Sequence, residues 1–186
     1  LQKVHEGPSY AVDLLRRGLR LGFIGGTDTH ATMPSGGGLE PGHIDRLPGL
    51  TAAMAPALSR EGVFRAIQGR RCYATSLERV LLDVSVGGAG MGEMVGWAAT
   101  SKPRAVRVSA AGQSDIVSIE IVRNGDVVQR MAPEGWQGRC VFEDGEDLGN
   151  LWLESRFLGC FVFYYARVTC ASGAQAWSSP VWLRRV

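Results

Sequence analysis

The pattern of apolar and polar positions along the chain changes character near residue 80. Before that point, two segments carry apolar side chains at helical spacing: residues 10–17, between Ser9 and Gly18, and residues 60–68, between Ser59 and Gly69. Serine before a helix and glycine after it are typical of helix ends, so the pattern predicts two amphipathic helices. Three short apolar runs predict strands, at residues 21–25, 49–55 and 70–76.

Beyond residue 80 the pattern alternates with a period of two, which is typical of half-buried strands. The strands predicted in this way are residues 82–88, 104–110, 116–122, 139–142, 161–169 and 176–183. The pair Asn124-Gly125 favours a tight hairpin, because both residues tolerate positive φ. About seven short strands with no convincing helix predict an immunoglobulin-like antiparallel β-sandwich.

Composition and charge are those of a globular protein rather than of a nucleic-acid or membrane binder. Of the 186 residues, 45% are hydrophobic and 20% are charged, and the formal net charge is +2. The chain has no block of like charges, so we expect neither nucleic acid nor an anionic membrane surface as a partner. The longest apolar run, residues 157–166, is too short to cross a bilayer.

The cysteines do not indicate a structural zinc site, because none of them shows Cys-x-x-Cys spacing. They are Cys72, Cys140, Cys160 and Cys170. Cys160 and Cys170 could pair if their strands adjoin, or all four could be buried thiols. The cysteines leave the compartment open, and we expect the cytoplasm.

The candidate chemistry lies directly after the first predicted strand, where Gly25-Gly26 is followed by Asp28 and His30. In an extended segment these two side chains point the same way, roughly 6 to 7 Å apart along the backbone. A carboxylate and an imidazole suit Zn, Mn or Fe. The alternative is that Asp28 caps a turn and His30 faces solvent. The two glycines leave room for a cofactor or another backbone to approach closely.

Other residues are candidates for substrate contact. Residues 31–56 are rich in glycine and proline, and we expect this long loop to lie over the site. His43, within it, could approach the metals or the substrate, or face solvent. Arg70 or Arg71 could contact an anionic substrate, with Tyr73 and Thr75 as hydrogen-bond donors. The alternative is an arginine at a helix C-terminus followed by an ordinary strand.

The order of the motifs resembles the C-terminal portion of the PHP-domain metallohydrolases, in particular the carbaryl-hydrolase-like subgroup with an appended β-sandwich. The resemblance runs over nearly the whole chain. The segments that carry it are residues 22–30, 49–52, 59–64, 71–75, 82–84, 123–125 and 177–182.

The resemblance implies a fold and a ligand set. The family's catalytic domain is a distorted (β/α)7 barrel that binds two or three metals, and its last metal motif is an Asp-x-His at a strand end. Asp28 and His30 would then be metal ligands, with Asp28 also catalytic through a bridge between a metal and the attacking water. We therefore expect the C-terminal part of such a barrel over residues 1–78, followed by the sandwich over residues 79–186.

The family's N-terminal His-x-His motif has no counterpart in this chain. The resemblance therefore implies a fragment of a metal-dependent hydrolase that acts on small phosphoesters or on carbamate or other esters. Divalent Zn, Mn or Fe would bind in the full-length protein, while the fragment alone would be inactive and could self-associate through its incomplete barrel. The alternative is a non-catalytic binding or scaffold module that uses the β-sandwich.

Overall fold

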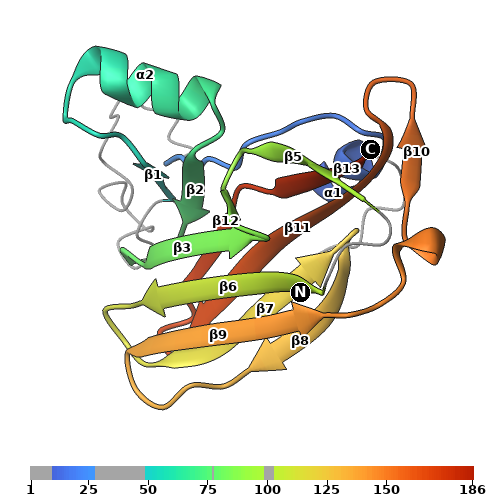
Figure 1. The fold of residues 1–186 in the computed structure, drawn as a ribbon. Coiled ribbons are helices and arrows are strands. Elements are labelled where there is room, and N and C mark those ends of the chain that lie inside the picture. Colours follow the sequence, from blue (N-terminus) through green and yellow to red (C-terminus); the bar gives the residue numbers. More distant parts are fainter. Residues whose placement is uncertain (1–9, 28–48, 77, 99–102) are drawn as a thin grey trace.

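The long strand β11 (Gly159–Cys170) is the centre of the larger of two sheets in the computed structural model (Figure 1). The structure describes residues 10–27, 49–76, 78–98 and 103–186. One edge of β11 pairs with β12 (Gln175–Ser178) and β13 (Val181–Arg185), and the other pairs with β7 (Ile116–Arg123) and β10 (Leu153–Ser155). Four strands therefore depend on β11 for their position.

The remaining strands complete two sheets. The larger sheet also contains β1 (Leu50–Ala53), β2 (Cys72–Thr75), β5 (Met94–Trp97) and β8 (Asp126–Met131). Its main path runs β1-β2-β12-β11-β13-β5, in which β13 and β5 are parallel. The smaller sheet has the order β4-β3-β6-β9, from β3 (Leu81–Val86), β4 (Ala89–Gly90), β6 (Arg104–Ala111) and β9 (Gln137–Asp144).

The main hydrophobic core lies between the two sheets. Inward-facing positions of both sheets contribute to it, for example Val84 and Val108 from the smaller sheet and Ile119 and Val168 from the larger. Along β3 and β6 the buried side chains alternate with exposed or half-buried ones, as the period-two pattern predicted, whereas β7 and part of β11 are buried at consecutive positions. Full burial of one such side chain contributes roughly 1.5–3 kcal/mol.

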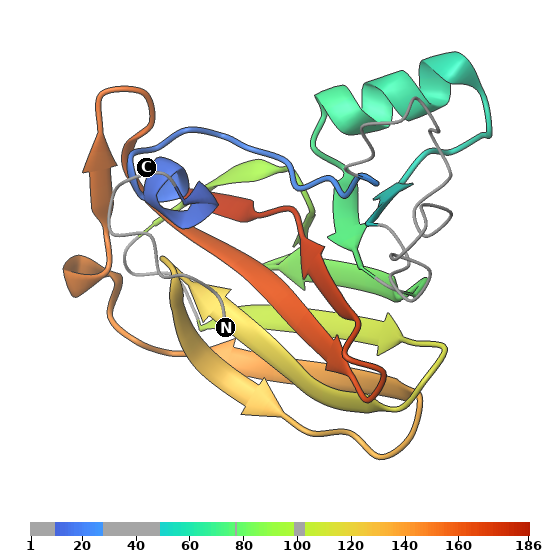
Figure 2. The same cartoon turned by 180° about the vertical axis from the view of Figure 1, so that it is seen from behind.

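A second apolar cluster lies on the outer face of the larger sheet, where α1 (Ala11–Arg16) packs (Figure 2). Leu15 of α1 is fully buried against Phe161, Phe163 and Trp182. The sheet therefore buries side chains on both faces near α1, and the residues that follow α1 lie across this outer face.

Several local predictions are confirmed. The second predicted helix is α2 (Arg60–Gln68), and the Ser59 side chain accepts a hydrogen bond from the Gly62 N–H at its start. Asn124 and Gly125 have φ of 53° and 98°, the values that a two-residue hairpin turn needs between β7 and β8. A short 3-10 helix, η1 (Leu148–Asn150), completes the elements. In the described ranges no helix is long and apolar enough to cross a membrane.

The predicted barrel portion is wrong. The described residues contain two α-helices and mainly antiparallel strands, and β1 and β2 are antiparallel neighbours rather than parallel barrel strands. β2 then pairs antiparallel with β12, so strands from before and after residue 79 share one sheet. The physical reason is that helix and strand periods fix the type of an element but not the direction of its partner. The barrel edges from which we expected self-association are not formed by the described strands.

Candidate functional site

Residues 19–27 cross the outer face of the larger sheet as an extended segment, and hydrogen bonds hold its backbone at Phe23 and Gly25. The Phe23 N–H donates to Ser179 Oγ at 2.8 Å. The Gly25 N–H donates to Thr51 Oγ1 at 3.1 Å, and that hydroxyl donates to the Gly25 carbonyl at 2.8 Å. This segment is no strand and Ile24 is 63% exposed, so the predicted buried strand at residues 21–25 is wrong.

The glycines of this segment permit a close approach of two backbones. A Cβ added at Gly25 would lie 2.5 Å from the Leu50 carbonyl oxygen, and one at Gly49 would lie 2.8 Å from the Gly26 carbonyl oxygen. Both distances are too short for a real side chain, so the site needs glycine at these positions. The sequence left open whether a cofactor or another backbone approaches these glycines. In the structure, a neighbouring backbone lies beside Gly25.

A pocket of about 570 Å³ lies beside this anchored segment. Its walls come from the start of α1, from the segment itself and from the outer face of the sheet. The side chains that give it its chemistry are Tyr10, Val12, Phe23, Tyr165 and Trp177, and Gly26 and Gly49 lie along it as well. The lining is therefore mainly aromatic and apolar, with hydroxyl groups as its polar part.

Tyr165 is the best-positioned polar group of this pocket. Its ring makes an edge contact with Phe23, with ring centroids 5.6 Å apart, and lies parallel to Phe163 at 6.4 Å. Burial raises the pKa of the Tyr165 hydroxyl, although the positive charges of Arg167 and Arg16 oppose this. The hydroxyl therefore stays protonated at neutral pH and can donate a hydrogen bond.

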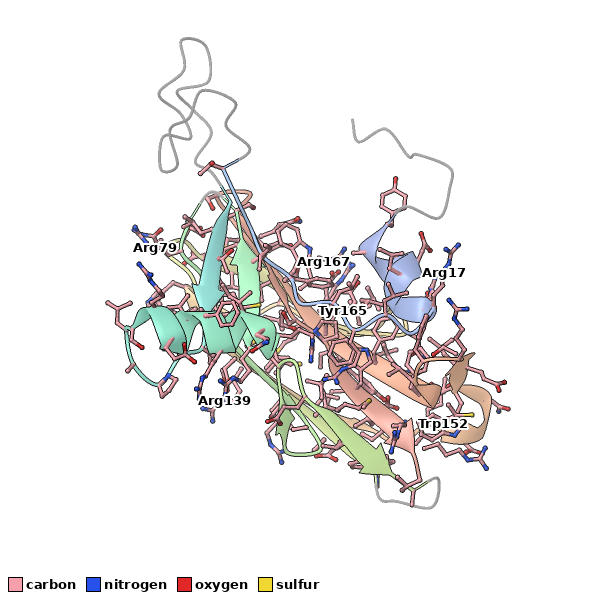
Figure 3. The ribbon with its side chains drawn as sticks, turned by 90° about the horizontal axis from the view of Figure 1, so that it is seen from above. Arg17, Arg79, Arg139, Trp152, Tyr165 and Arg167 are labelled. Atoms are coloured by element: carbon pink, nitrogen blue, oxygen red, sulfur yellow. The ribbon has the colours of Figure 1, made fainter. Side chains whose placement is uncertain are left out.

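The arginines next to the pocket are paired with one buried carboxylate. Glu120 is 4% exposed and lies between Arg130 and Arg167, with Arg167 Nε donating to Glu120 Oε2 at 2.5 Å. Arg167 is the register partner of both Glu120 and Trp177. Figure 3 shows Tyr165 and Arg167 projecting from the same side of the sheet, so the charged cluster adjoins the aromatic wall.

The predicted metal and loop residues Asp28, His30 and His43 lie outside the described residues. The described part of the chain ends at Thr27 and resumes at Gly49. The role of these three residues stays a prediction.

The predicted substrate-contact residues Arg71, Tyr73 and Thr75 do not share one surface. Arg71 is exposed. Tyr73 and Thr75 are the register partners of Ser178 and Ala176, positions that face the core between the sheets, and the Tyr73 hydroxyl accepts a hydrogen bond from the Leu82 N–H at 3.3 Å. Thr75 also borders the aromatic pocket, and its Oγ1 is buried with no hydrogen-bond partner among the described residues.

Sequence reasoning missed a buried ionic network at one end of the sandwich. Asp144, 2% exposed, accepts hydrogen bonds from Arg123 and Tyr164 and pairs with Arg104 at 2.9 Å. Arg104 and Asp144 continue the inward-facing phase of β6 and β9, whose other members are apolar. A charged residue at an inward position of a period-two strand is the signal that could have revealed it.

The described residues do not supply a metal site of their own. They contain no group of three or more His, Cys, Asp or Glu side chains that could hold a metal ion. All four cysteines are free thiols, so Cys160 and Cys170 form no disulfide. Ligation by Asp28 and His30 would need further groups from outside the described ranges.

No family model matches the chain. Uncharacterized proteins of Chlamydia trachomatis and Chlamydia muridarum are each 34% identical to it, over 96% and 91% of this chain and 29% and 28% of their own length. An uncharacterized protein of Chlamydia pneumoniae is 32% identical over 92% of this chain and 28% of its own. The chain thus spans less than a third of these relatives.

Among solved structures, an engineered protein matches 58% of this chain and 20% of its own, with 17% identity and a TM-score of 0.31. This likeness is too weak to support a conclusion about the fold.

Proposed function

We propose that this chain is part of a metal-dependent hydrolase of small esters or phosphoesters, in which Asp28 and His30 supply two of the metal ligands. The observation that supports the proposal is the anchored segment that leads to them. It is bonded to the sheet at Phe23 and Gly25, and Gly26 lines an aromatic pocket. Two residues before the candidate ligands, the backbone is therefore held beside a space that can receive a substrate.

The pocket would bind the part of the substrate that does not react. Phe23, Tyr165 and Trp177 offer apolar faces to an acyl or alcohol portion of the ester. The protonated Tyr165 hydroxyl can donate a hydrogen bond to an ester oxygen. These groups would orient the substrate, which is the contribution that a fixed pocket makes to catalysis.

The metal would polarise the scissile group and lower the pKa of a bound water when it is present. Because the described residues hold no complete ligand set, the other ligands would have to come from other parts of the protein. The relatives are more than three times as long as the matched region, which leaves room for such ligands.

The test is a comparison of metal content and hydrolysis in the whole protein. The double variant Asp28→Asn, His30→Ala should lose bound metal by elemental analysis, together with hydrolysis of generic carboxylic and phosphate esters. His5→Ala, which also removes a histidine, is the matched control and should retain both. Unchanged metal content in the double variant would refute the ligand assignment, and a whole protein without hydrolysis would favour a binding or scaffold module instead.

The pocket has its own test. Trp177→Ala should raise KM for esters with a large apolar portion by about tenfold, the value of one lost apolar contact of roughly 1.4 kcal/mol. The kcat for a small ester such as an acetate should change little. If Trp177→Ala impaired the hydrolysis of large and small esters equally, the pocket would not be the place where the substrate binds.

A further inference from the structure

Two arginines from distant parts of the chain converge on Gly92. Arg20 Nη2 donates to the Gly92 carbonyl oxygen at 2.8 Å. A Cβ added at Gly92 would lie 2.7 Å from the carbonyl carbon and oxygen of Arg70. The Arg70 side chain in turn lies against Gly22, whose added Cβ would be 3.0 Å from Arg70 Cγ. The extended segment, the end of α2 and the residues before β5 thus bring the two arginines together.

Neither of these half-buried arginines is neutralised by a carboxylate among the described residues. The Nε atoms of both are enclosed and have no hydrogen-bond partner there. The arginines of the ionic clusters, Arg104, Arg123 and Arg167, each contact Asp144, Glu146 or Glu120. Burial and the positive charge of Arg70 lower the pKa of Arg20, as expected for neighbouring like charges without a counter-ion.

The Arg20 side chain is held in place before any ligand binds. The Arg20 guanidinium lies 5.2 Å from the centre of the Trp182 ring, a cation–π contact. Arg70 has φ of 59°, a left-handed backbone conformation that is unfavourable for arginine. Arg70 follows the last residues of α2, and its N–H donates to the Ile67 carbonyl while the Arg71 N–H donates to the Ala66 carbonyl, so the left-handed conformation is part of the helix end. With both Nε atoms enclosed and Arg20 Nη2 bonded to the Gly92 carbonyl, Arg20 Nη1 and the Nη groups of Arg70 are the donors left for a ligand.

We propose that Arg20 and Arg70 form a binding site for a phosphate group. Two guanidinium groups carry two positive charges, which a phosphate dianion neutralises and a carboxylate does not. The tetrahedral oxygens of phosphate accept hydrogen bonds from donors on two separate segments, and arginine is well suited to this geometry. None of the contacts behind this site involves Asp28 or His30, so the proposal does not rest on the hydrolase proposal.

The test is titration with inorganic phosphate, followed by calorimetry and by the shift of the melting temperature, at constant ionic strength. Phosphate should bind once per chain and raise the melting temperature, and acetate should do neither. Arg70→Gly removes one guanidinium and also relieves the left-handed backbone, so this variant should fold and should bind phosphate about tenfold more weakly or worse. Arg20→Gln should have the same effect on binding.

Arg17→Gln is the matched control, because Arg17 is exposed and lies three positions before Arg20. This variant removes one positive charge without touching the pair and should bind phosphate as the unaltered chain does. The proposal is overturned if phosphate does not bind, or if Arg70→Gly binds it normally. Equal binding of acetate would overturn the assignment of a phosphate dianion. If Arg17→Gln weakened phosphate binding as much as Arg70→Gly, the binding would reflect only the net charge of the chain, and the proposal would be overturned.

Discussion

The phenolic oxygen of Tyr164 lies 2.7 Å from Oδ2 of Asp144 and donates a hydrogen bond to it. Tyr164 belongs to the central strand of the larger sheet, and Asp144 is the last residue of β9 in the smaller sheet. Their contact closes one end of the core between the sheets. Burial raises the pKa of Tyr164, and its hydrogen bond to Asp144 raises it further, so the phenol remains a donor throughout the neutral range.

Removal of the Asp144 charge should destabilise the fold strongly. Asp144→Asn leaves Arg104 and Arg123, both buried, without their shared counter-ion. Breaking a buried ion pair in this way costs about 3–5 kcal/mol. Glu143→Gln, which alters the exposed neighbouring carboxylate, should change the free energy of unfolding by no more than about 0.5 kcal/mol. Urea unfolding of both variants measures the difference, and similar values would show that the network adds little.

The same network should make stability depend on acid pH. Burial opposes ionisation of Asp144, but the hydrogen bonds from Arg123 and Tyr164 and the charge of Arg104 outweigh it, so the pKa of Asp144 is lowered. The unfolded chain therefore takes up this proton first, at a pKa of about 3.9. The contribution of Asp144 is complete above that pH and is lost as the pH falls through the lower folded pKa.

Unfolding free energies of the unaltered chain and of Asp144→Asn should thus converge as the pH falls below about 4. Between about pH 6 and 8, titration of Asp144 should not change the difference between the two unfolding free energies. A difference that stays constant down to pH 2 would show that Asp144 does not titrate with a lowered pKa.

The contact between the extended segment and β1 gives a sharp test at two adjacent glycines. Gly25→Ala places a methyl group 2.5 Å from the Leu50 carbonyl oxygen and should cost about 1–3 kcal/mol through displacement of the backbone. Gly26→Ala meets nothing within 4 Å and should be neutral to within about 0.5 kcal/mol. Thermal unfolding of the two variants compares them directly, and equal stability would mean that the two backbones are not in close contact.

Cysteine reactivity should distinguish Cys170 from Cys160. Burial, together with the hydrogen bond and charge of Glu78, raises the pKa of Cys170 to about 12. Since the thiolate is the reactive form, only about one in ten thousand Cys170 thiols is reactive at pH 8. A disulfide reagent should therefore label the half-buried Cys160 in the native chain and Cys170 only after unfolding. Cys160→Ser should remove the native labelling, and persistent rapid labelling of Cys170 would contradict its burial.

How much could be predicted from the sequence depended on the range of the interaction. The cap at Ser59, the stop at Gly69 and the Asn124-Gly125 turn were predictable, because each rests on conformational preferences of a few neighbouring residues. The structure of residues 21–25 was not predictable, since an apolar run forms a strand only where another strand pairs with it. The surroundings of Tyr73 and Thr75 were not predictable either, because they depend on the pairing of β2 with the distant strand β12.

The sequence by itself determined the helix ends, the hairpin and most strands of the second half, because local dihedral preferences and the period-two pattern are written into neighbouring positions. Only the tertiary structure decided that β1 and β2 join the large sheet antiparallel, that Asp144 meets two arginines and that Arg20 and Arg70 converge on Gly92. These contacts join residues far apart in the chain, and no local preference specifies which distant segment becomes the partner.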